Sequence, residues 1–279
     1  MAGAINAAQL EALAARAWPA LWSQRIDGWL LRRTPSVARR RLNSALPVGD
    51  GAAIEEVERF YREHGEIPRV QVAPAESLGA LDRDLAERGW RADGATDILV
   101  ARDVCSQGDL AVSVRPAVDR AWLQAWIIAE GRPDAEETYG RVLQRIPSPA
   151  GFAIARFEGR PAGVGIAVCE GGWSGVFCMA TDPVMRRRGI ARAVLSALAE
   201  WSRAQGARGL YRRSSATTRQ PRRCTRRWAS PARTAITSAR ASSRRIHSHP
   251  GIRCTVRRTV RETTVTPSAL PTSGKSCRQ

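Results

Sequence analysis

Residues 175–206 constrain the fold most, because they predict a strand, a loop and a helix in immediate succession. Residues 176–180 are a short apolar run suited to a buried strand, and Asp182 with Pro183 ends that run as a turn. Apolar residues then recur at helical spacing until Gly206, which predicts an amphipathic helix that ends at this glycine. The unit is therefore strand, loop and helix.

The loop of this unit predicts a phosphate site. Gly189 allows the backbone to come close to a ligand, and the following helix begins with unpaired N–H groups at the positive end of its dipole. The Gly-Lys-Ser/Thr of a Walker loop and the Gly-x-Gly-x-x-Gly of dinucleotide sites do not occur there, which argues against a nucleoside triphosphate or NAD. Arg186, Gly189 and Ala191 instead match the acetyl-CoA signature Arg/Gln-x-x-Gly-x-Gly/Ala. In this the chain resembles the GNAT superfamily of N-acetyltransferases.

The resemblance implies two roles for the residues of this unit. The strand end would pair with the pantetheine arm of acetyl-CoA and direct an amide at the thioester oxygen. The loop would bind the pyrophosphate through backbone amides, with arginine charge added. The matching residues are Met179, Ala180 and Thr181 for the strand, and Arg187, Arg188, Gly189, Ile190, Ala191 and Arg192 for the loop. An ordinary solvated position is the alternative for Arg187 and Arg192.

Residues 1–104 predict helix, two strands, helix, strand, helix and strand, which is an α+β order. The first two strands are expected to be a hairpin of residues 28–32 with residues 40–45. This half resembles the amino-terminal half of some two-part GNAT proteins, in which a degenerate copy of the fold precedes the working one. The resemblance rests on residues 18–20, 28–32, 40–44 and 81–90. We assign this half to packing and a wall of the substrate cleft, with a ligand of its own as the alternative.

Residues 103–109 are a polar break and predict the boundary between the halves. Residues 112–116 then predict a strand ending in Arg-Pro, and residues 152–169 predict a hairpin before the strand of the unit. Residues 110–211 would thus be the acetyl-CoA-binding domain. The predicted fold class is α+β, with a mostly antiparallel mixed sheet and flanking helices in two tandem halves, followed by a basic tail of low order.

Catalysis requires a deprotonated amine, a polarised thioester carbonyl and a proton for the leaving thiolate. The family usually supplies this proton from a tyrosine on a segment Asn-x-x-Ala-x-x-Leu-Tyr-x-x-x-Gly-Phe after the acetyl-CoA helix, and no such segment follows the helix here. Tyr139 and Tyr211 do not match its position. Three acids are suggested only as groups that orient an amine: Glu130, Glu136 and Glu137. The sequence therefore assigns no catalytic acid or base.

The net charge of +18 is concentrated at one end of the chain. Residues 212–279 hold 17 of the 44 Lys and Arg but only one of the 26 Asp and Glu. The nearly neutral remainder does not indicate a nucleic-acid-binding face. No apolar run approaches the roughly 18 residues that span a bilayer, and the Ala-rich beginning is not a charged leader. We therefore expect a cytoplasmic protein with no membrane partner.

The six cysteines include no Cys-x-x-Cys pair, which suits reduced thiols better than a disulfide framework. A zinc site could be drawn from the tail residues Cys224, His247, His249 and Cys254. Their spacing fits no compact zinc finger, so we expect no metal.

Residues 212–279 are rich in Arg, Ser and Thr without periodicity, so they cannot bury enough apolar surface to become ordered. One interpretation is a disordered basic arm that binds nucleic acid or another anionic surface. The other is translation out of frame after Tyr211. With permissible codons for residues 213–231, the same bases displaced by one position encode Val-Glu-Arg-Asp-Asn-Ala-Pro-Ala-Pro-Ala-Leu-Tyr-Ala-Ala-Leu-Gly-Phe-Ala. This contains the missing tyrosine segment, and we favour the second interpretation.

The resulting hypothesis is an N-acetyltransferase that moves an acetyl group from acetyl-CoA to a primary amine and is impaired by an aberrant C-terminus. The alternatives are an acyl-CoA-binding module without catalysis and a nucleic-acid binder that uses the tail. The acceptor is expected to be a small-molecule or peptide amine. Acceptor loops carry no motif, so the sequence leaves the acceptor and the oligomeric state open.

Overall fold

The computed structural model describes residues 5–49, 53–73, 79–102, 110–215 and 260–267. The elements of the first half are α1 (Ala7–Ala17), β1 (Trp22–Ile26), β2 (Trp29–Arg33), η1 (Arg40–Leu42), β3 (Leu46–Pro47), α2 (Ile54–Glu63), β4 (Val70–Val72), α3 (Gly79–Glu87) and β5 (Trp90–Ala101). Those of the second half are β6 (Val112–Arg115), α4 (Arg120–Glu130), η3 (Pro133–Ala135), α5 (Glu136–Leu143), β7 (Ala150–Phe157), β8 (Arg160–Glu170), β9 (Trp173–Thr181), η4 (Pro183–Met185), α6 (Ile190–Ala204) and β10 (Gly209–Ser215). The tail contributes β11 (Val260–Pro267).

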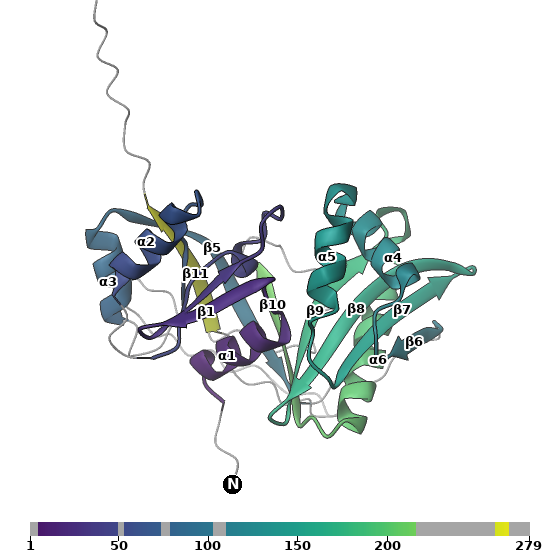
Figure 1. The fold of residues 1–279 in the computed structure, drawn as a ribbon. Coiled ribbons are helices and arrows are strands. Elements are labelled where there is room, and N and C mark those ends of the chain that lie inside the picture. The colour runs from purple at the N-terminus through teal and green to yellow at the C-terminus, as the bar shows by residue number, and fades with distance from the viewer. Residues whose placement is uncertain (1–4, 50–52, 74–78, 103–109, 216–259, 268–279) are drawn as a thin grey trace, which may run out of the picture.

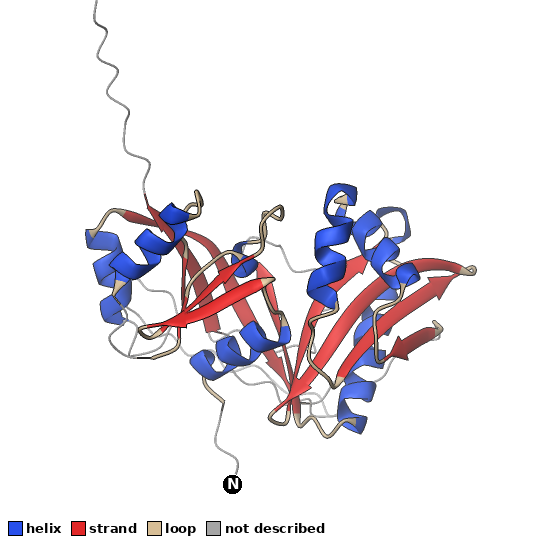
Figure 2. Ribbon diagram, viewed as in Figure 1, coloured by secondary structure: helices blue, strands red, loops and turns tan. Residues whose placement is uncertain are grey.

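One eight-stranded sheet runs through both halves in the order β4-β11-β5-β10-β9-β8-β7-β6 (Figure 1). The halves meet where β5 pairs antiparallel with β10, from Ala101↔Leu210 to Thr96↔Ser215. β9 and β10 run parallel because α6 crosses between them, as a parallel connection requires. The architecture confirms the predicted α+β class, with a mostly antiparallel sheet and flanking helices (Figure 2).

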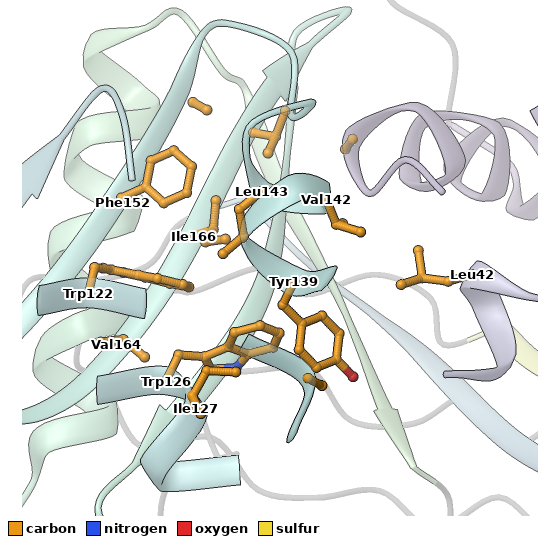
Figure 3. Packing of buried hydrophobic residues seen from close by; sticks show 14 of the residues in the cluster. Leu42, Trp122, Trp126, Ile127, Tyr139, Val142, Leu143, Phe152, Val164 and Ile166 are labelled. Carbon is orange, nitrogen blue, oxygen red and sulfur yellow. The ribbon is translucent and has the colours of Figure 1, made fainter. Parts of the chain in front are cut away.

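Helices cover both faces of this sheet. α6 buries Val194 and Leu198 against one face of the second half. α4 and α5 cover the other face, where Trp122, Trp126 and Tyr139 pack together (Figure 3). On that same face α1 lies over β5 and β10. No helix among the described residues is long and apolar enough to cross a membrane.

The hairpin of the first half differs from the expected one. β2 pairs with β1 across a tight turn at Asp27 and Gly28, whose φ angles of 40° and 81° suit an Asp-Gly hairpin turn. β2 also pairs antiparallel with the short strand β3, Trp29 with Pro47 and Leu30 with Leu46, so this partner begins just after residues 40–45, which contain the η1 turn. The prediction placed this partner too early, and it missed β1 because it passed over the Asp-Gly signal.

Two segments of the tail depart from the expectation of low order. Residues 212–215 complete β10. The guanidinium of Arg213 forms an ion pair with Glu11 of α1, and the side chain of Glu11 is only 1% exposed. The backbone of β11 pairs antiparallel with both β4 and β5. Most of the tail, including the four residues considered for zinc, lies outside the described residues.

Gly165 in the middle of β8 allows α6 to pack closely on the sheet. A Cβ atom at this position would lie 2.6 Å from Met179 Sδ and 2.9 Å from Val194 Cγ1. We expect Gly165→Val to lower the free energy of unfolding by about 1–3 kcal/mol through overpacking. Urea unfolding checks this, with Gly79→Ala as the control because no described residue comes within 4 Å of its Cβ position. Equal stability of Gly165→Val and the unmodified chain would contradict the packing argument.

Candidate functional site

β9 and β10 begin as paired strands and then separate. The pairing runs from Trp173↔Gly209 to Val176↔Arg212 and stops there. Beyond it, residues 177–181 pair with β8 on one side, while their other edge faces no strand among the described residues. Figure 1 shows the two strands diverging from their common start. The result is an opening between β9 and β10 in which one strand edge of the sheet is unpaired.

A bulge in β9 marks the point of divergence. Ala180 pairs with Val164 and Phe177 with Ile166, so Cys178 and Met179 lie opposite the single residue Gly165. Cys178 has a φ of 51°, in the left-handed region that side-chain-bearing residues seldom adopt. An extra residue of this kind bends a strand and increases its twist. The bulge therefore accounts for the bending of β9 away from β10.

A cavity of about 530 Å³ fills the opening. Its lining residues are Trp18, Ala38, Arg39, Arg40, Arg41, Thr96, Trp126, Glu130, Val176, Phe177, Cys178, Met179, Arg212 and Arg213. Both halves contribute to this lining. Trp18 follows α1 and residues 39–41 lie at η1, all in the first half, whereas Trp126 and Glu130 come from α4 in the second half. This supports the assignment of the first half to a wall of the cleft.

The start of α6 forms an exposed corner at the loop that was predicted to bind phosphate. Gly189 precedes the helix with a φ of 80°, and Arg187 also has a positive φ, of 68°. No side chain of the described residues caps this helix, so its first amides are available to a ligand. Within the described part of the chain, nothing lies within 4 Å of the Cβ position of Gly189, which leaves space for a ligand against the backbone. The fifteen-residue helix directs its positive dipole end at this space.

The structure places the predicted site residues along one continuous segment. Met179 lines the cavity, and Ala180 with Thr181 continues β9 from the cavity to the loop. The loop residues Arg187, Arg188, Gly189, Ala191 and Arg192 are exposed around the start of α6. Ile190 differs from these because its side chain is buried in the core under α6. Only its backbone amide can therefore contribute to a site.

The suggested polar groups separate into those that reach the cavity and those that do not. Glu130 lines it, whereas Glu136 and Glu137 at the start of α5 do not. The Tyr139 hydroxyl accepts a hydrogen bond of 3.0 Å from Nε of Arg39, which also pairs with Glu130. Tyr211 is not part of the cavity lining, although its ring packs edge-on against Phe177, which is. Burial raises the pKa of the Tyr211 hydroxyl.

Several cavity residues were missed by sequence reasoning. Residues 39–41 come from the loop before β3, more than 130 positions before the strand of the site. Arg40 and Arg41 were assigned to the predicted strand of residues 40–45, and Arg39 was not assigned. Cys178 had no sequence pattern that indicated a place in the cavity. Burial raises the pKa of its thiol, so the thiol stays protonated at neutral pH. Among the described residues, no three His, Cys, Asp or Glu side chains form a metal-binding group.

Residues 5–229 match the model of a protein family described as "Probable histone acetyltransferase Rv0428c C-terminal". The chain belongs to this family, within the GNAT superfamily. By family it is an N-acetyltransferase. The match ends at residue 229, so the remaining fifty residues of the tail fall outside it.

One curated relative and two solved structures extend this comparison of the GNAT chain. It is 23% identical over 213 residues to the uncharacterized N-acetyltransferase YobR of Bacillus subtilis, covering 73% of this chain and 85% of that protein. Its fold is similar to a GCN5-related N-acetyltransferase from Kribbella flavida, with a TM-score of 0.64, 13% identity and coverage of 96% and 97%. A GNAT-family structure from Novosphingobium aromaticivorans gives a TM-score of 0.53 at 15% identity, covering 88% and 92%.

Proposed function

We propose that this GNAT chain transfers the acetyl group of acetyl-CoA to a primary amine. The observation that carries the proposal is the unpaired edge of β9 at residues 177–181, which leads from the cavity to the uncapped start of α6. The pantetheine arm carries amide groups and would add to this edge as a strand does. The pyrophosphate would then reach the amides of Gly189, Ile190 and Ala191, with Arg187, Arg188 and Arg192 adding charge.

The bulge in β9 would lie beside the thioester. Because Cys178 and Met179 leave the regular ladder, a backbone amide there can point into the cavity and donate to the thioester oxygen. The acceptor amine would enter between Trp18 and α4, where Glu130 supplies the single carboxylate of the lining. We assign Glu130 to holding the amine and assign no proton donor for the thiolate.

The lack of an assigned donor is the reason for proposing impaired turnover. Tyr211 lies outside the cavity lining, and the Tyr139 hydroxyl is bound to Arg39. Binding of acetyl-CoA depends on β9 and α6, both of which precede Tyr211. We therefore propose that this chain binds acetyl-CoA well but releases the CoA thiol slowly.

Calorimetric titration with acetyl-CoA at two salt concentrations, beside a titration with duplex DNA, tests the proposal. We expect saturable binding of acetyl-CoA, and slow thiol release when a panel of primary amines is added. Binding without thiol release for any amine would favour a non-catalytic acyl-CoA-binding module. Salt-sensitive binding of DNA without binding of acetyl-CoA would favour a nucleic-acid binder instead.

A further inference from the structure

Phe157 lies at the same end of the sheet as the loop before α6. It ends β7 and is followed by a two-residue turn, in which Glu158 and Gly159 have positive φ angles of 50° and 76°. β8 begins at this turn, and its Gly163 pairs with Thr181 at the end of β9. The turn between β7 and β8 therefore lies close to the loop that leads from β9 into α6 (Figure 1).

The core under α6 holds the ring of Phe157 in place. The side chain is half-buried and packs against the cluster that contains Ile190, the first residue of α6. Val194, one turn further along the helix, belongs to the same cluster. Because the hydrophobic packing fixes one side of the ring, Phe157 presents its remaining surface at a defined position beside the start of the helix.

The ring of Phe157 contacts the guanidinium of Arg188. The guanidinium carbon lies 5.0 Å from the ring centroid, which is within the range of a cation–π contact. Arg188 directly precedes Gly189 and is exposed to solvent. A guanidinium has five N–H donors in a fixed fork, more than a contact with one ring can use, so donors remain for the oxygen atoms of an anion.

This contact distinguishes Arg188 from two other arginines of the loop. Arg187 and Arg192 make no cation–π contact with any ring of the described residues. A long exposed side chain loses rotamer entropy when it binds a ligand, and this loss lowers the affinity. A side chain that is already held against a ring loses less, so Arg188 is prepared for binding before a ligand arrives.

We propose that Phe157 is a positioning residue that holds Arg188 for a phosphate of CoA, an inference that rests on the proposed function. Phe157 lies outside the acetyl-CoA signature matched by Arg186, Gly189 and Ala191, and it acts through the guanidinium rather than on the ligand. The pyrophosphate and the 3′-phosphate of CoA present the same kind of oxygen acceptor to an arginine. A comparison of CoA with dephospho-CoA separates these two phosphates.

Calorimetric titration with CoA tests the inference without depending on turnover. Phe157→Leu keeps an apolar side chain against the cluster but removes the ring, and we expect CoA to bind about 2- to 10-fold more weakly, the usual effect of immobilising one long side chain. Phe157→Tyr restores the ring and is expected to restore the affinity. A loss with CoA alone assigns Arg188 to the 3′-phosphate, whereas an equal loss with dephospho-CoA assigns it to the pyrophosphate.

Double variants show whether Phe157 acts through Arg188. Arg188→Gln alone is expected to weaken CoA binding about 10-fold, and adding Phe157→Leu to it should cause no further loss. In the matched Arg187→Gln background, which removes the neighbouring charge, the loss from Phe157→Leu is expected to persist. Equal losses in both backgrounds, unchanged affinity in Arg188→Gln or in folded Phe157→Leu, or a Phe157→Tyr variant as weak as Phe157→Leu would overturn the inference. Failure of the unmodified chain to bind CoA would instead overturn the proposed function.

Discussion

Replacing Gly189 by aspartate is expected to weaken acetyl-CoA binding about 100-fold, or about 2.8 kcal/mol. The substitution adds a carboxylate beside the proposed position of the pyrophosphate, at the start of α6, whose first turn contains no acidic side chain. Two like charges about 4 Å apart at a protein surface repel by several kcal/mol, so the electrostatic effect is sufficient. The dissociation constant from calorimetry measures it.

Two further variants separate charge from backbone strain. Gly189→Ala imposes the same positive φ of 80° without the charge, and its Cβ meets no atom of the described residues within 4 Å, so we expect a smaller loss of affinity. Gly206→Asp places the same charge at a glycine of φ 82° beyond the other end of α6 and is expected to leave affinity unchanged. Circular dichroism confirms that each variant is folded. Unchanged acetyl-CoA affinity in folded Gly189→Asp would remove this corner from the site.

Restoring the displaced reading frame after Tyr211 is expected to raise thiol release about 10²- to 10⁴-fold, the usual contribution of a positioned acid. The displaced reading supplies a tyrosine seven residues after its asparagine, together with apolar residues suited to a helix. We propose that this tyrosine protonates the thiolate that leaves acetyl-CoA. Steady-state thiol release by the two chains, with the same amines, measures the effect.

The ion pair of Arg213 with Glu11 decides how the restored chain should be built. The displaced reading begins with valine in place of Arg213, which would leave the buried carboxylate of Glu11 without this partner. Loss of one partner of a buried ion pair typically costs about 3–5 kcal/mol. Two versions are therefore compared, one displaced from residue 213 and one that keeps Arg213 and is displaced after it. Equal thiol release by the given chain and both versions would show that the tail is not a lesion.

Local patterns were sufficient for the unit at the centre of the site. The apolar run before Asp182, the glycine at position 189 and the helical spacing up to Gly206 predicted β9, the loop and α6, and all three are present. These signals lie within about thirty neighbouring residues, where backbone preference and amphipathic periodicity act directly. The antiparallel hairpin of β7 and β8 was predicted for the same reason.

The shape of the site depended on contacts between distant residues. The pairing of β10 with β5, the bulge at Cys178 and the seating of residues 39–41 beside α4 have no local signal. Each results from packing between segments far apart in the chain, which local propensity cannot specify. The sequence by itself predicted the strand, loop and helix start at which we propose that the acetyl-CoA phosphates bind. The tertiary structure alone brought residues 39–41, Trp126 and Glu130 to the opening of β9, because Leu42 of the first half is buried in the same core cluster as Tyr139 of the second half.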